Sequence, residues 1–89
     1  MRVEQVVLVN RLGLHARAAS RLVNCASAYE SDVRLVRGAK SINAKSIMGV
    51  LTLAAAKGTE LTVETEGPDE KQAYDALIQL IGERFGEED

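Results

Sequence analysis

Residues 60–66 have the sequence Glu-Leu-Thr-Val-Glu-Thr-Glu, and successive side chains in a strand point to opposite faces. Leu61, Val63 and Thr65 therefore share one face, while glutamates dominate the other. A strand with one acidic face cannot be buried on both sides, so that face of its sheet stays in water. The segment predicts a sheet that other elements cover on one face only.

The residues that follow this strand predict a helix. Gly67 and Pro68 precede the acids Asp69 and Glu70, and proline and acidic residues are common in the first turn of a helix. The expected buried stripe of this helix consists of Ala73, Leu77, Leu80, Ile81 and Phe85. The last residues, Glu87 to Asp89, are expected to form a solvated tail.

The first half of the chain predicts a strand, a helix and a hairpin. Residues 2–9 form a β-branched run of strand length, and residues 16–29 carry apolar side chains at helical spacing. Residues 32–37 and 40–44 have strand character and flank Gly38, which suits a tight reversal. These residues are therefore expected to form two short strands joined by a turn.

A short helix is expected over residues 47–53, with Ser46 as its N-terminal cap and Gly58 as its stop. The element order is then β-α-β-β-α-β-α. Helices between the strands of an alternating sheet can cover its apolar face, which predicts a two-layer α+β sandwich. The length of 89 residues predicts one small domain, residues 1–89, without a deep enclosed pocket.

Composition limits the chemistry that we expect. Cys25 is the single cysteine, so an internal disulfide is excluded, and it is expected to be a buried apolar filler. One histidine and one cysteine give no zinc-type ligand set, and we expect no metal and no cofactor. No apolar run approaches a bilayer span and residues 1–4 lack a signal-peptide pattern, so a cytoplasmic protein without membrane insertion is expected.

Charge is distributed unevenly along the chain. Residues 1–45 carry a net charge of +5 and residues 46–89 a net charge of −7. Five cations of the basic half lie near the polar sites described below: Arg11, Arg17, Arg21, Lys40 and Lys45. This pattern predicts a partner with an acidic docking face. Nucleic acid is not an expected partner, because the chain is acidic overall and has only three aromatic residues.

The single histidine, His15, lies where a glycine-containing loop runs into the helix expected from Ala16. Unpaired N–H groups and the positive end of the helix dipole make a helix start an anion site. An imidazole there can hold a phosphoryl group and release it, and Nδ1 is favoured because it is nearer the backbone. Arg17, in the same turn, is placed to reach an anion on the ring.

The short helix over residues 47–53 cannot bury every side. Val50, Leu53 and Ala54 are expected on its core face. The remaining apolar side chains then form an exposed patch with a basic rim, as at a docking surface. We predict that partners bind to six residues: Arg21, Asn24, Lys45, Ile47, Met48 and Leu51.

Two motifs lie at expected helix starts. Residues 13–19 are Gly-Leu-His-Ala-Arg-Ala-Ala and residues 45–51 are Lys-Ser-Ile-Met-Gly-Val-Leu. Together with residues 67–70 leading into Ala73, they make the chain resemble the HPr family, the histidine-containing phosphocarrier proteins of the bacterial phosphoenolpyruvate:sugar phosphotransferase system. The resemblance spans essentially the whole chain.

The resemblance implies both a fold and a function. The family fold is an open-faced β-sandwich, in which three helices cover one face of a four-stranded antiparallel sheet. The resemblance implies that His15 takes a phosphoryl group from enzyme I and passes it to IIA domains of sugar permeases, and that Arg17 neutralises it. It also implies that Ser46 is a regulatory phosphorylation site, with an HPr kinase/phosphorylase as a further partner. A monomeric carrier is expected, rather than an independent enzyme.

The chain departs from the family pattern at Ala18, where members commonly have proline. Proline in a first helical turn fixes φ and removes an N–H that lacks a helical partner. Alanine is therefore expected to lower stability slightly and to leave the chemistry intact.

Other interpretations remain open from the residues. A lone histidine at a helix start is often a surface or capping residue, and a capping role explains Ser46 fully. A small hydrolase using His15 needs a substrate pocket and a second acid–base group. A ferredoxin-like interaction module leaves His15 incidental. The runner-up is a carrier of the nitrogen-related phosphotransferase branch, although residues 45–49 look more like the sugar branch.

Overall fold

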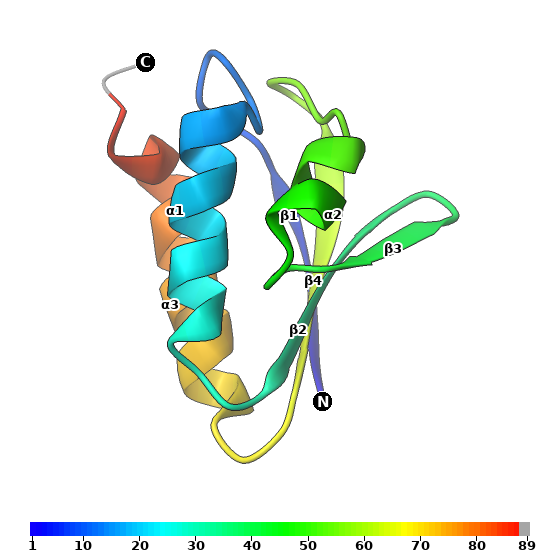
Figure 1. Ribbon diagram of the computed structural model, residues 1–89, viewed down its shortest axis with the longest axis vertical. Coiled ribbons are helices and arrows are strands. Elements are labelled where there is room, and N and C mark those ends of the chain that lie inside the picture. Colours follow the sequence, from blue (N-terminus) through cyan, green and yellow to red (C-terminus); the bar gives the residue numbers. More distant parts are fainter. Residues whose placement is uncertain (88–89) are drawn as a thin grey trace.

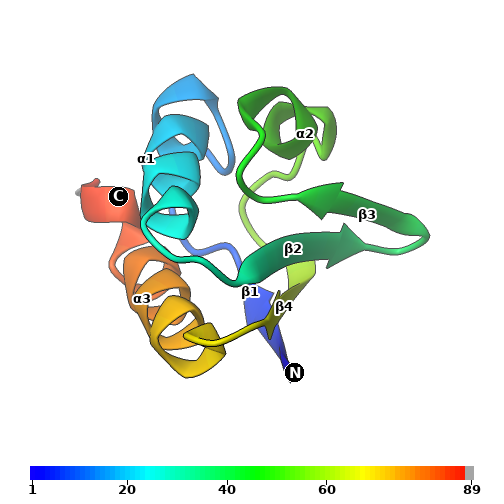
Figure 2. The same cartoon turned by 60° about the horizontal axis from the view of Figure 1, so that its bottom comes forward.

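A four-stranded antiparallel sheet with the strand order β1-β4-β2-β3 forms one layer of the molecule. The computed structural model describes residues 1–87. Its strands are β1 (Arg2–Val7), β2 (Asp32–Arg37), β3 (Lys40–Asn43) and β4 (Glu60–Glu66). Its α-helices are α1 (Ala16–Ser27), α2 (Ile47–Thr52) and α3 (Glu70–Gly82), and they lie on one face of the sheet (Figure 1 and Figure 2). The predicted open-faced α+β sandwich is confirmed.

Strand β4 lies inside the sheet, between β1 and β2. It pairs with β1 from Arg2↔Thr65 to Val7↔Glu60 and with β2 from Asp32↔Glu66 to Val36↔Thr62. Its inner side chains, those of Leu61, Val63 and Thr65, are buried, and its terminal glutamates are exposed. The predicted alternation is therefore confirmed.

The core lies between the sheet and the three helices. Its largest fully buried apolar side chains come from all these elements and the loops between them: Leu8, Leu22, Val33, Leu35, Val50, Leu53, Leu61, Val63, Leu77 and Phe85. Burial of each stabilises the fold by roughly 1.5–3 kcal/mol. Because α1, α2 and α3 all contribute, the core fixes the position of each helix start.

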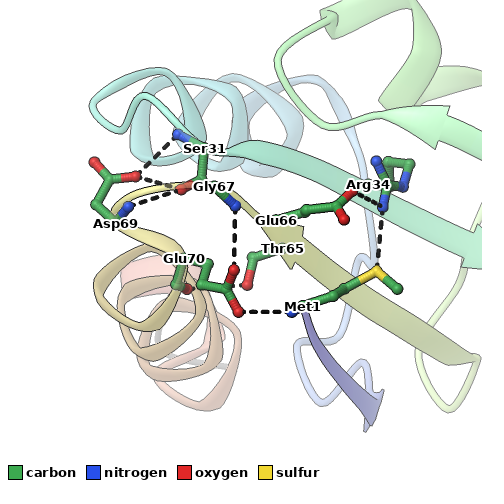
Figure 3. A network of polar contacts seen from close by, with 8 residues as sticks. All are labelled: Met1, Ser31, Arg34, Thr65, Glu66, Gly67, Asp69 and Glu70. Atoms are coloured by element: carbon green, nitrogen blue, oxygen red, sulfur yellow. Dashed lines mark hydrogen bonds and ion pairs between the residues drawn. The ribbon is translucent and has the colours of Figure 1, made fainter.

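Polar contacts fasten the end of the molecule where β4 turns into α3 (Figure 3). The Asp69 carboxylate accepts hydrogen bonds from the Ser31 hydroxyl at 2.5 Å and the Ser31 N–H at 2.9 Å. The Ser31 hydroxyl bond is the main cause that lowers the pKa of Asp69. A Cβ on Gly67, whose φ is +148°, would lie 2.6 Å from Ser31 Oγ, so this close approach requires glycine. The N-terminal ammonium of Met1 pairs with Glu70 at 2.9 Å beside it.

Two elements end earlier than predicted. Strand β1 was expected to reach residue 9 but ends at Val7, because Leu8 exchanges hydrogen bonds with the turn before β4, donating to Thr59 O and accepting from Gly58 N–H. Helix α1 was expected to reach residue 29 but ends at Ser27, where the chain tightens into a 3₁₀-type turn.

The predicted stop of α2 at Gly58 is wrong. The helix ends at Thr52, and Gly58 belongs to the turn before β4. Side chains of the β2–β3 hairpin satisfy the carbonyl groups at the helix end: Lys40 Nζ donates to Thr52 O at 3.0 Å and Arg37 Nη1 donates to Leu53 O at 2.6 Å. Because cations from elsewhere in the fold bind these carbonyls, the helix needs no glycine to end there.

The predicted continuation of α3 to Phe85 is also wrong. The helix ends at Gly82, and Arg84, Phe85 and Gly86 have φ values of 58°, 56° and 78°. Left-handed backbone at a residue other than glycine costs about 1–3 kcal/mol, so this C-terminal turn (residues 84–86) is strained. The Phe85 ring is buried in the core, and the Arg21 guanidinium donates to the Phe85 carbonyl. These two anchors hold the turn against the start of α1.

Candidate functional site

His15 is the N-cap of α1. Its backbone is extended, with φ −77° and ψ 177°, and its carbonyl accepts from Ala19 N–H at 2.8 Å. Its Nδ1 accepts a hydrogen bond of 3.2 Å from Arg17 N–H. The imidazole thus replaces the usual hydroxyl or carboxylate cap, and its side chain is 26% exposed. The prediction that His15 lies at a helix start is confirmed.

The loop before His15 is fixed by a close approach to the chain after α2. Leu14 N–H donates to Ala55 O at 2.9 Å, and the Leu14 side chain is buried. Gly13 has φ +63°, and a Cβ there would lie 2.4 Å from Ala55 O. Only glycine allows this contact, so residue 13 sets the direction in which the histidine enters α1.

The second ring nitrogen of His15 is paired with a carboxylate. Nε2 pairs with Oε2 of Glu87, and Oε1 of Glu87 accepts from Asn10 Nδ2 at 2.9 Å. The hydrogen bond from Asn10 is the main cause that lowers the pKa of Glu87, with the His15 contact and the charge of Arg17 acting in the same direction against partial burial. The carboxylate is therefore held ionised beside the imidazole.

The prediction of a solvated tail is wrong at Glu87, whose side chain is only 13% exposed. The rest of that predicted tail, residues 88–89, lies outside the described residues. The strained C-terminal turn brings Glu87 to His15 across 72 positions of sequence. The only local signal was the apolar Phe85 close behind the helix, which anchors the turn in the core. Asn10, fully buried between the loop and Glu87, was missed for the same reason.

The predicted cations near His15 differ in their contacts. Arg17 is exposed, and its charge contributes to the low pKa of Glu87. Arg21 is engaged with the Phe85 carbonyl, and Lys45 Nζ donates to Tyr29 O at 2.7 Å, beyond the end of α1. Asn24 is exposed on α1. Arg21 and Lys45 are therefore held in place by backbone carbonyls.

Ser46 is the N-cap of α2, and its Oγ accepts from Gly49 N–H at 3.1 Å. The residue is exposed. The predicted capping role is confirmed.

Helix α2 presents the predicted apolar patch. Ile47 is 42%, Met48 68% and Leu51 36% exposed, whereas Val50 and Leu53 are buried as predicted. Ala54, expected on the core face, is instead exposed and has φ +51°, because the chain leaves the helix before it. Helices α1 and α2 pack against each other, so the patch and His15 belong to neighbouring elements (Figure 2).

Cys25 is partly buried against the core, and burial raises the pKa of its thiol. The reactive thiolate is therefore disfavoured, and the predicted role as an apolar filler fits this position.

Two hollows on the surface of residues 1–87 have no lining residue near His15 in the sequence. One of about 460 Å³ is lined by residues of β1 and α3, and one of about 260 Å³ by residues of the β2–β3 hairpin. Among residues 1–87, no three of the metal-ligating side chains His, Cys, Asp and Glu come together at a possible ion site. No helix in this part of the chain is both long enough and apolar enough to cross a bilayer. His15 lines neither of these two hollows, and its side chain is 26% exposed.

Comparison with known proteins agrees with this architecture. The family model described as the PTS HPr component phosphorylation site matches residues 3–83. The phosphocarrier protein HPr of Cupriavidus necator is 51% identical over 80 residues, which are 90% of each chain. The crystal structure of HPr-C-His from Thermoanaerobacter tengcongensis has a TM-score of 0.96 at 40% identity and covers 99% of both chains. An HPr dimer from that organism has a TM-score of 0.79 at 39% identity, covering 98% of this chain and 100% of that one.

A small open-faced sandwich that presents one histidine at a helix start is the architecture of a phosphoryl carrier. The chain belongs to the HPr family, the phosphocarrier proteins of the phosphotransferase system.

Proposed function

We propose that this chain accepts a phosphoryl group on Nδ1 of His15 from phosphorylated enzyme I and passes it to IIA domains of sugar permeases. The observation that carries the proposal is the imidazole at the start of α1, which caps the helix through Nδ1 and remains partly exposed. Free N–H groups and the helix dipole stabilise an anion at this point, the dipole by about 0.3–1 kcal/mol. Family membership supports the same role.

Transfer needs no general base, because the neutral ring attacks with its own lone pair. As the bond from Nδ1 to phosphorus forms, the bond from phosphorus to the donor breaks, and no water is consumed. The N–H of Arg17 then donates to a phosphoryl oxygen instead of Nδ1, and the Arg17 guanidinium adds a positive charge. Positioning and charge supply most of the catalysis in phosphoryl transfer, and the partner enzyme contributes much of both.

The docking surface consists of the patch on α2 and the polar side chains beside it: Arg21, Asn24, Lys45, Ile47, Met48 and Leu51. Its apolar centre is exposed. Arg21 and Lys45 are already ordered by their bonds to Phe85 and Tyr29, which reduces the entropy that binding costs. This arrangement suits partners with an acidic rim around an apolar contact.

Phosphorylation of Ser46 by a kinase is the proposed means of regulation. A phosphate at the start of α2 is tolerated by the helix, since its N–H groups and dipole favour an anion. The same charge lies beside Met48 and Ile47 and repels a partner with an acidic face. Docking is therefore weakened while the fold is kept.

The alternative function is a carrier in the nitrogen-related phosphotransferase branch. The sequence Lys-Ser-Ile-Met-Gly at residues 45–49 favours the sugar branch. The two branches use different donor enzymes, so the donor that phosphorylates the chain distinguishes them.

The test is incubation of the purified chain with enzyme I and phosphoenolpyruvate, followed by intact mass and acid-lability measurements. We expect an acid-labile gain of one phosphoryl group that His15→Ala abolishes with an unchanged circular dichroism spectrum. Parallel reactions with enzyme I of the nitrogen branch are expected to be much slower. Phosphorylation of the His15→Ala chain at the wild-type rate would contradict the proposal.

A further inference from the structure

We propose that Glu87 is a positioning residue for phosphoryl transfer: its carboxylate covers Nε2 of His15 and directs the incoming phosphoryl group to Nδ1. The inference rests on the proposed function, since it takes His15 as the phosphoryl acceptor. It concerns which ring nitrogen reacts, and this can be measured without any partner protein.

Glu87 uses both carboxylate oxygens in fixed contacts. Oε2 pairs with Nε2 of His15, and Oε1 accepts from Asn10 Nδ2 at 2.9 Å. Asn10 is fully buried, and its Nδ2 also donates to Gly13 O at 2.8 Å. The carboxylate therefore cannot leave Nε2 without breaking a contact to a residue that is itself fixed. The two nitrogens of the ring are thus distinguished by their neighbours.

The backbone turn that places Glu87 beside His15 is held by specific contacts. Arg84 and Phe85 have left-handed backbone, although neither is glycine. Such conformations persist only where the surroundings enforce them, and they gather at functional sites. Here the buried Phe85 ring and the Arg21 guanidinium on the Phe85 carbonyl enforce the turn. The turn ends beside the start of α1, as Figure 1 shows.

A carboxylate on one ring nitrogen determines what the other can do. It accepts a hydrogen bond from Nε2–H and so favours the tautomer that leaves the lone pair on Nδ1. When Nδ1 bonds to phosphorus, the ring gains positive charge, and the adjacent carboxylate compensates that charge. The Nε2 proton remains between the ring and Glu87 throughout, so no additional acid or base enters the step.

Phosphoramidate tests this inference, because it is a small donor that phosphorylates imidazole without an enzyme. Its P–N bond breaks and ammonia leaves as the new bond to a ring nitrogen forms. ³¹P NMR separates the Nδ1-phosphorylated and Nε2-phosphorylated isomers of histidine. We expect the wild-type chain to give the Nδ1 isomer. In Glu87→Ala we expect the Nε2 isomer to increase at least about tenfold, as loss of one charge-assisted hydrogen bond allows.

Two further variants distinguish the charge of Glu87 and its contact with Nε2 from a general effect on the fold. Glu87→Gln keeps an oxygen over Nε2 without the charge, so we expect the wild-type isomer at an acceptance rate about fivefold lower. Glu83→Ala is the matched control, because Glu83 is an exposed acid four residues earlier. Its carboxylate accepts a hydrogen bond from Gln79 Nε2 at 3.2 Å. This variant is expected to match wild type in isomer and rate. Amide ¹H–¹⁵N spectra check that each variant is folded.

The outcomes distinguish this inference from the proposed function. A folded Glu87→Ala chain that yields only the Nδ1 isomer at the rate of Glu83→Ala would overturn the role of Glu87. If Glu87→Ala does not fold, a wild-type rate for Glu87→Gln would overturn the role of its charge. A wild-type chain that accepts from phosphoramidate at Nδ1 but not from enzyme I would contradict the proposed function and leave the role of Glu87 supported by the variants.

Discussion

The imidazole of His15 has different partners on its two nitrogens. A backbone N–H of the first helical turn donates to Nδ1, and a carboxylate from the far end of the chain pairs with Nε2. The first partner is a weak donor that can transfer its hydrogen bond to a phosphoryl oxygen. The second is a charged group with a second anchor at Asn10. The ring therefore has one nitrogen that can react and one that is held.

Arg17→Ala is expected to slow phosphoryl acceptance by about tenfold or more, because a charge-assisted contact to the phosphoryl group is lost. The backbone N–H that reaches Nδ1 remains, and stability should change by less than about 0.5 kcal/mol, as for an exposed side chain. Transfer kinetics from enzyme I and urea unfolding measure the two effects. Lys71→Ala, which removes an exposed cation at the start of α3, is the control. Equal rates in both variants would assign no role to the Arg17 guanidinium.

At the residue scale, local chemistry could be predicted from the sequence and distant partners could not. The positions of His15 and Ser46 follow from signals within a few residues of each, namely a glycine loop and a helix cap. Glu87 and Asn10 depend on how the two ends of the chain meet. That meeting is set by a left-handed turn at Phe85, a conformation that side-chain patterns do not indicate.

At the scale of elements, the first turn of α1 contains the departure from the family pattern. Ala18→Pro is expected to raise the free energy of unfolding by about 0.4–1 kcal/mol by restricting the unfolded chain. Ala18 lies in the turn whose N–H groups have no helical acceptor, so proline loses no hydrogen bond there. Ala19→Pro is the matched control and should destabilise, because Ala19 N–H donates to His15 O. Lower stability of Ala18→Pro in urea would show that the buried site has no room for the ring.

Ser46→Asp is expected to raise the apparent KM for enzyme I while the melting temperature stays the same or rises slightly. The added charge suits the start of α2 but lies beside the exposed Met48. Ser46→Asn is the matched control, because it keeps a capping oxygen without the charge. The difference in KM between the two variants should shrink as salt is added. Equal KM values at low salt would leave Ser46 as a cap without a regulatory role toward enzyme I.

Element types were predictable because periodicity and cap residues are local, whereas the ends of β1, α1, α2 and α3 were not, and the two helices α2 and α3 show why. Helix α2 ends where Lys40 and Arg37 bind its carbonyl groups, and both come from a hairpin before the helix. Helix α3 ends before Phe85, whose ring is buried and whose carbonyl accepts from Arg21 in a left-handed turn. In both cases tertiary contacts override the local signal.

At the scale of the whole molecule, three carboxylates among residues 1–87 have lowered pKa values: Asp69, Glu70 and Glu87. Their folded-state pKa values lie below those of the unfolded chain, which are about 4. Each therefore stabilises the fold above that pH, and this stability is lost as the pH falls through the folded-state values. We expect the urea midpoint to be constant from pH 7 to about 5 and to fall steadily below about 4.

Asp69→Asn tests the assignment of this acid sensitivity. It should be less stable than wild type at pH 7, since the amide is a weaker acceptor for the Ser31 hydroxyl. The difference in the free energy of unfolding between Asp69→Asn and wild type should narrow at pH 3, where the wild-type carboxylate is itself protonated. A constant difference in unfolding free energy over the whole pH range would show that groups other than Asp69 cause the acid sensitivity.

The strand order β1-β4-β2-β3 also bears on how the chain is made. Strand β4 is synthesised last, yet it is the hydrogen-bonding neighbour of both β1 and β2. A nascent chain ending before residue 60 therefore has only the β2–β3 pair of its sheet, and an isolated two-stranded hairpin is marginally stable in water. Ribosome-bound chains that end before β4 should be digested readily by protease, and resistance should appear only once residues 60–66 have left the exit tunnel. The sheet of this protein is thus expected to form only after β4 has left the ribosome.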